Sequence, residues 1–152
     1  MGADRNYDSD LVLWAEDQAR ALRSSAHTRV NLPIDWQNVA EEIESLGKSQ
    51  ARELASRIET ILVHLIKLQA SPANNPRIGW RATIQRQRNE IAALLSDSPS
   101  LRQTIPAVID AASGKARRVA ELELADFGEQ PQVDLNAVSY TEAQVIGDWF
   151  PT

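Results

Sequence analysis

Two glutamates and a histidine are the residues whose types and spacing first suggest chemistry. Glu41 and Glu44 are three positions apart, so on a helix they would share one side, and His64 follows in the same apolar-periodic stretch. Inward-facing Glu and His side chains can hold metal ions in helical bundles, but di-iron and di-manganese bundles use Glu-x-x-His pairs. The sequence has no Glu-x-x-His and only two histidines. We therefore predict a structural polar network here, with no catalytic, cofactor or metal site.

Arg88 is the fourth member of this predicted network. It falls beside the apolar stripe of a later helix, where its planar guanidinium could reach inward to Glu44. His64 is expected to form a hydrogen bond with a carboxylate, and Glu44 or Glu41 is the candidate. An enzyme built from these four residues is a less favoured alternative, and the sequence leaves open whether the network is structural or functional.

A group of arginines on one predicted helix suggests a second kind of chemistry. Arg77, Arg81, Arg86 and Arg88 surround Trp80, and basic residues beside an aromatic can contact nucleic-acid phosphates. Trp80 lies in the apolar stripe, however, and four charges are few beside the roughly 6–10 phosphate contacts of a typical binder. The next helix adds three basic residues: Lys115, Arg117 and Arg118. A nucleic-acid-associated protein is therefore an alternative that we do not favour.

Composition places these residues in an ordinary globular chain. The 152 residues are 43% hydrophobic and 24% charged, which suits one domain over residues 1–152 with its own core. There is no cysteine, so disulfides, thiolate catalysis and cysteine-ligated metals are excluded. The net charge is −5, and no Lys or Arg follows Arg118, so the last part of the chain would repel nucleic acid.

The element that must position Glu41, Glu44 and His64 is one long helix over residues 35–69. Apolar residues keep helical period throughout, and Asp35 is placed to cap the start. Gly47 is the weak point, because an interior glycine costs about 1 kcal/mol against alanine. A break there stays open, although the period on both sides favours a continuous or gently bent helix. The second half is apolar almost all round, which predicts a central position.

The remaining elements are also helical. A first helix should start at 8–10, a third should run over about 77–95, and a fourth should start with Ser98 as N-cap and Pro99 in its first turn. Residues 1–7 are expected to be a loose N-terminus. Residues 127–152 should form a loop, a short helix and a docked aromatic tail. The predicted class is all-α: an antiparallel four-helix bundle-like core with one long central helix and a short C-terminal helix.

An ordered set of short blocks resembles the bacterial domain-of-unknown-function family number twenty-nine. The resemblance runs from Tyr7 to Phe150, and the blocks follow in the same order. They are Tyr7…Asp10…Trp14, Asp35-Trp36…Ala40-Glu41-Glu42-Ile43-Glu44-Ser45-Leu46-Gly47, His64-Leu65…Lys67…Gln69, Trp80-Arg81-Ala82-Thr83-Ile84…Gln87-Arg88 and Asp97-Ser98-Pro99-Ser100-Leu101. The resemblance implies an all-helical fold and an uncharacterised family, and it carries over no catalytic residue.

The sequence indicates a broad class of function but no specific activity. The absence of catalytic motifs favours a non-enzymatic helical protein-interaction module of a bacterial cytosolic protein. Since the long helix exceeds its neighbours, part of its apolar length should stay uncovered, which suggests another protein or a second copy of the chain as partner. No 18-residue apolar stretch could span a membrane, so no membrane partner is expected and the cytoplasm is the predicted compartment. The biochemical activity and the identity of the partner stay open.

Overall fold

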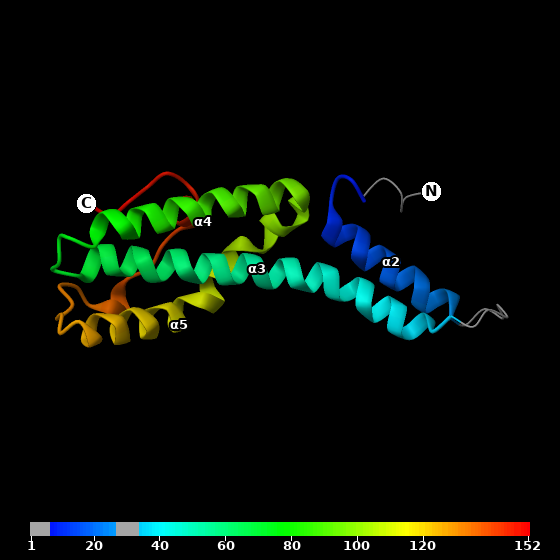
Figure 1. Cartoon of the computed structure of the whole chain (residues 1–152), viewed down its shortest axis with the longest axis horizontal. Coiled ribbons are helices and arrows are strands. Elements are labelled where there is room, and N and C mark those ends of the chain that lie inside the picture. The colour runs from blue at the N-terminus through cyan, green and yellow to red at the C-terminus, as the bar shows by residue number, and fades with distance from the viewer. Residues whose placement is uncertain (1–6, 27–33) are drawn as a thin grey trace. The chain divides into compact units, whose positions relative to one another are not determined.

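The computed structural model describes residues 7–26 and 34–152 (Figure 1). Residues 1–6 of the predicted loose N-terminus, and His27, lie outside this part. The described part is helical, with no strand, so the predicted all-α class is confirmed. Its elements are α2 (Leu11–Ser25), α3 (Trp36–Ala70), α4 (Arg77–Asp97), the 3₁₀ helix η1 (Pro99–Thr104), α5 (Ile105–Asp126), the 3₁₀ helix η2 (Leu135–Ala137) and α6 (Glu142–Ile146).

The described residues divide into two compact units, and each is described by itself. Unit 1 comprises residues 7–26, 34–53 and 93–102, so it holds α2, the first half of α3 and the end of α4. Unit 2 comprises residues 54–92 and 103–152, with the second half of α3, most of α4, α5 and the C-terminal segment. That the whole chain is one domain stays a prediction.

In unit 1, Asp10 caps two helices at once. Its carboxylate accepts hydrogen bonds from the Leu13 N–H at 2.9 Å, from the Ser100 N–H at 2.6 Å and from the Ser100 hydroxyl at 3.0 Å. These groups lie in the first turns of α2 and η1, where backbone N–H groups have no partner within the helix. Asp10 is buried, and it therefore ties the start of α2 to the start of η1.

The first half of α3 packs against α2 through small residues. α3 continues through Gly47 without a break, and a Cβ at that position would meet Val12 and Ala15 of α2 at 3.6–3.7 Å. Ala19 and Ala40 are buried as well. Small side chains on facing helices let the two backbones approach closely, but they bury little apolar area.

The core of unit 2 is built from large aliphatic side chains. Every apolar residue of α3 from Ile58 to Leu68 is buried, so the predicted central position of this half is confirmed. α4 runs antiparallel to it, since Arg57 donates to Gln87 near one end and the Lys67 ammonium lies over Trp80 near the other. α5 runs parallel to α3, because its ion pairs join residue 59 to 115 and residue 67 to 123.

The predicted start of the fourth helix needs a correction. Pro99 begins the 3₁₀ helix η1, and α5 begins only at Ile105, with Pro106 in its first turn. Ser98 directly precedes η1, and its hydroxyl donates to Gln50 Oε1 at 2.8 Å. A sequence pattern cannot separate an α-helical first turn from a 3₁₀ one, since both accept proline there.

Candidate functional site

Glu44 forms an ion pair with α2. Arg23 Nη2 donates to Glu44 Oε2 at 2.7 Å, and Lys48 Nζ lies 3.7 Å from the same oxygen. The hydrogen bond from Arg23 is the main reason that the pKa of Glu44 is lowered. The pair lines a surface hollow of about 450 Å³ together with Glu16, Arg20 and Ser24. Since Arg20 also pairs with Asp17, at 3.0 Å, the hollow offers little unbalanced charge to a ligand.

Glu41, three residues earlier, is exposed. Its backbone carbonyl accepts a hydrogen bond from the Ser45 hydroxyl at 2.9 Å, which is a contact within the helix. Glu41 and Glu44 therefore share a side of α3 but not a common partner.

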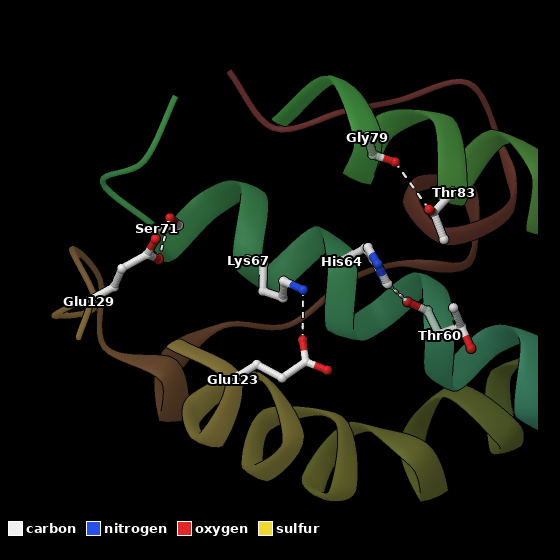
Figure 2. Close-up of polar contacts among 8 residues, drawn as sticks. All are labelled: Thr60, His64, Lys67, Ser71, Gly79, Thr83, Glu123 and Glu129. Atoms are coloured by element: carbon white, nitrogen blue, oxygen red, sulfur yellow. Dashed lines mark hydrogen bonds and ion pairs between the residues drawn. The ribbon is translucent and has the colours of Figure 1, made fainter. Parts of the chain in front are cut away.

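His64 bonds along its own helix (Figure 2). Its Nδ1 lies 2.8 Å from the Thr60 carbonyl oxygen, and because a carbonyl only accepts, Nδ1 carries the proton and Nε2 is the nitrogen that titrates. Burial lowers the pKa of His64, and the nearby Lys67 ammonium lowers it further. The prediction that His64 bonds the carboxylate of Glu44 or Glu41 is wrong. The protonated nitrogen of His64 bonds the Thr60 carbonyl one turn earlier in α3, and Glu44 bonds Arg23.

The inward-pointing cation of α3 is Lys67, which the sequence analysis did not single out. Figure 2 shows its ammonium reaching from α3 to α5, where Nζ donates to Glu123 Oε2 at 2.6 Å. The same Nζ lies 4.8 Å from the centre of the Trp80 ring, within the range of a cation–π contact. Lys67 is buried, and Trp80, with Glu123, supplies the negative environment that the ammonium needs. The position of Lys67 within an apolar stretch of the sequence is the pattern that could have indicated this contact, because a buried lysine requires a partner.

A second contact closes the end of α3 in Figure 2. The buried Ser71 donates its hydroxyl proton to Glu129 Oε2 at 2.6 Å and accepts the Ala73 N–H at 3.0 Å. One residue back, the Ala70 carbonyl accepts the Gln132 N–H at 2.8 Å. These bonds satisfy groups at a helix C-terminus and attach the loop after α5 to it. The Ser71 hydroxyl therefore has a structural role.

Arg88 is the most enclosed charged side chain of unit 2. It is only 5% exposed, and its guanidinium donates to the carbonyls of Val145 at 2.9 Å, Gln144 at 2.8 Å and Trp149 at 2.7 Å. The Phe150 ring lies 4.8 Å from the Arg88 Cζ. Arg88 therefore holds the C-terminal segment on α4, and it does so through backbone acceptors that no side-chain pattern could reveal.

The Arg88 charge is only partly compensated. Burial lowers its pKa, and the charge of Asp148 acts in the opposite direction. Its Nη1 is inaccessible to solvent and, among the residues that the structure describes, has no hydrogen-bond partner. An unpaired donor of this kind costs stability, so the other three bonds must outweigh it.

The four predicted network residues therefore do not form one group. Glu41 and Glu44 belong to unit 1, and His64 and Arg88 belong to unit 2. The predicted Arg88–Glu44 pairing is wrong, because Arg88 binds three carbonyls and Glu44 binds Arg23. Periodicity could place each residue on the correct side of its helix, but it could not choose the partner.

The arginines of α4 do not present one basic face. Arg88 is buried, and the Arg81 guanidinium lies 5.2 Å from the Phe150 ring centre. Arg77 is half-buried, and Arg86 is exposed. At most three of the four can therefore contact a phosphate group.

A polar hollow of about 460 Å³ lies between α5 and the loop before η2. Arg118 and Glu121 line it from the helix, and Asp134 lines it from the loop. Arg117 donates to the Val138 carbonyl at 3.0 Å, which attaches the residue after η2 to α5. Charges of both signs border the hollow, so it selects no one class of ion.

An apolar stripe on the first half of α3 is incompletely covered within unit 1. It consists of Trp36, Val39, Ile43 and Leu46. Val39 is 38% exposed and Leu46 is 48% exposed, whereas Trp36 and Ile43 are half-buried. The adjoining Gly47 faces α2, and Ala40, seven residues earlier on the same side of the helix, is buried as well. α2 therefore covers one edge of the stripe, and the other edge is open.

Over residues 7–26 and 34–152, no helix combines the length and apolar character needed to cross a bilayer. In the same ranges, no cluster of three or more His, Asp or Glu side chains is placed to hold a metal ion.

Comparison with known proteins places the chain in a family. No curated protein matches it. Among solved structures it is similar to an alpha-helical protein of unknown function from Rhodospirillum rubrum, with 27% identity, a TM-score of 0.78 and coverage of 95% of this chain and 91% of that one. The matches indicate no specific function. The sequence model of the domain of unknown function DUF29 matches residues 6–143, which is most of the chain, so the protein belongs to the DUF29 family.

Proposed function

We propose that this protein is a non-enzymatic helical interaction module that binds another protein through the open apolar stripe of α3. The observation that carries the proposal is the exposure of Val39 and Leu46 on one face of unit 1. These positions are seven residues apart, so they lie above one another on the helix. Apolar side chains that recur on one helix face and stay in water are typical of an interaction surface.

The contrast with the polar groups supports this choice. The hydrogen bonds of three buried polar residues stabilise unit 2; these residues are Lys67, Arg88 and Ser71. A catalytic acid, base or nucleophile needs a free position toward a substrate, and these groups face their structural partners. The candidate polar residues thus support stability, whereas the apolar stripe is a surface that α2 leaves partly uncovered.

The nucleic-acid alternative loses one of its four arginines. Arg88 cannot contact a phosphate while its guanidinium is bound to three backbone carbonyls. Arg81, in turn, shares Phe150 with Arg88. Heparin retention that falls steeply with salt would revive this alternative.

A photo-crosslinking amino acid placed at Leu46 tests the proposal in the source cell. We expect adducts with one protein species, and we expect Val39→Glu on the same chain to remove them. A chain with the crosslinker at the exposed Arg86 of α4 is the matched control, and it should form none of these adducts. Equal adducts at both positions, or adducts that survive Val39→Glu, would contradict the proposal.

The bacterial cytoplasm stays the proposed compartment. The similarity to a protein of Rhodospirillum rubrum is consistent with a bacterial origin. Fractionation of the source cells, followed by immunodetection, would test the location, and recovery with the membrane pellet would contradict it.

A further inference from the structure

The spacing of the open stripe matches one kind of partner. Trp36, Val39, Ile43 and Leu46 follow one another at intervals of three, four and three residues. This is the narrow a/d repeat that a second helix packs against in a coiled coil. We propose that the occupant is an amphipathic helix of another protein, with Lys or Arg beside its apolar seam. The inference rests on the proposed function and names its partner.

The stripe has a defined length. It begins at the first residue of α3 and ends before Gln50, whose side-chain oxygen accepts the Ser98 hydroxyl proton. At a rise of 1.5 Å per residue, the distance from Trp36 to Gln50 is about 21 Å. A partner helix of roughly two to three heptads would therefore cover the stripe.

The charge on the open edge points to basic flanking residues. On a helical wheel, Asp35 and Glu42 border the stripe on the edge away from Ala40 and Gly47, which face α2. Glu42 is exposed and, within the described ranges, has no ion-pair partner. Asp35 accepts hydrogen bonds from Asn38, which leave its negative charge in place. Charges beside an a/d seam select the partner, so this edge favours Lys or Arg.

The same charges disfavour a second copy of this chain. If two α3 stripes paired antiparallel about a two-fold axis, with Val39 of each opposite Leu46 of the other, the axis would pass near residue 42. The two Glu42 carboxylates would then lie across the seam from each other. Like charges at facing positions are destabilising, whereas a basic helix would form attractive pairs at the same places.

Synthetic peptides provide the test with the full-length chain. One three-heptad peptide carries Leu and Ile at its seam and Lys at the flanking positions, and a second has Glu at those positions. Fluorescence anisotropy at low salt should show the Lys peptide binding at least about tenfold more tightly, with a gap that narrows as salt is added. Glu42→Lys should shrink or reverse this preference, and Leu46→Glu should abolish binding.

The controls separate this inference from the proposed function. Leu122→Glu changes an apolar residue of unit 2 that is 65% exposed, and it should leave peptide binding unchanged. Circular dichroism would verify that each variant is folded. If Leu46→Glu does not fold, Val39→Glu takes its place in the binding experiment. Equal binding of both peptides, or binding of neither, would overturn the inference. Sedimentation showing self-association that Leu46→Glu removes would also overturn it, yet would leave the stripe as an interaction surface. Crosslinking at Leu46 that Val39→Glu does not change would overturn the proposed function itself.

Discussion

The two units use the same long helix in opposite ways. In unit 1, α3 contacts α2 through alanines and Gly47, while Val39 and Leu46 stay in water. In unit 2, α3 buries Ile61, Leu65 and their neighbours, and it also encloses the charged Lys67. Along α3, apolar side chains are thus partly exposed in unit 1, whereas in unit 2 the apolar side chains are buried together with a charged one. The comparison teaches that stability resides mainly in unit 2, because buried apolar area is the dominant favourable term in folding.

The strongest way to break this comparison is to remove the buried arginine. Arg88→Met deletes three charge-assisted hydrogen bonds and leaves the carbonyls of the C-terminal segment without donors. We expect a loss of about 3 kcal/mol in the free energy of unfolding, measured by denaturant titration. Arg86→Met, two residues away and exposed, is the control and should change stability by less than about 0.5 kcal/mol. An Arg88→Met chain as stable as the control would show that the tail is not held by this residue.

The ion pairs of the two units should differ in strength. A double-mutant cycle on Lys67 and Glu123 should give a coupling free energy of about 1–2 kcal/mol that changes little with salt, because the ammonium is shielded from water. The same cycle on Arg23 and Glu44 should give a smaller value that salt screens, since both side chains are partly exposed. Equal couplings in the two cycles would remove the distinction between the units.

Unit 1 can be strengthened at its small-residue contact. A Cβ at Gly47 would meet α2 at ordinary contact distances. Gly47→Ala should therefore raise the free energy of unfolding by up to about 1 kcal/mol, since it lowers the entropy of the unfolded chain and raises helix propensity. Gly47→Leu, which must displace α2, is the contrasting variant and should destabilise the protein. A destabilising Gly47→Ala would mean that α2 and α3 lie closer than the structure places them.

The smallest effect is expected from pH. Because the pKa of His64 is lowered in the folded protein, the unfolded chain takes up its proton first as the pH falls below the ordinary value of 6.5. The contribution of the neutral His64 ring to the free energy of unfolding is fully present above pH 6.5. It is lost as the pH falls toward the pKa of His64 in the folded protein. The free energy of unfolding measured between pH 7.5 and about 5 should fall less steeply in His64→Asn. His27 is kept in both chains, so the difference isolates His64, and identical slopes would contradict the assignment.

Most helix positions and their apolar faces follow from local sequence patterns. The apolar period from Trp36 to Leu68 and the cap at Asp35 are local features, and the structure has a helix where they predict one. These features depend on residues three or four positions apart, which sequence spacing records directly.

The partners of the buried polar side chains depend on tertiary packing. Asp10 capping η1, Lys67 between Trp80 and Glu123, and Arg88 on three backbone carbonyls all join residues far apart in the chain. Partner choice at such positions depends on helix direction and on backbone groups that every residue carries, so side-chain patterns cannot specify it. The same reason explains the open stripe. The period marks Val39 and Leu46 as apolar-face residues, but only the packing of α2 over Ala40 and Gly47 decides that they are left exposed.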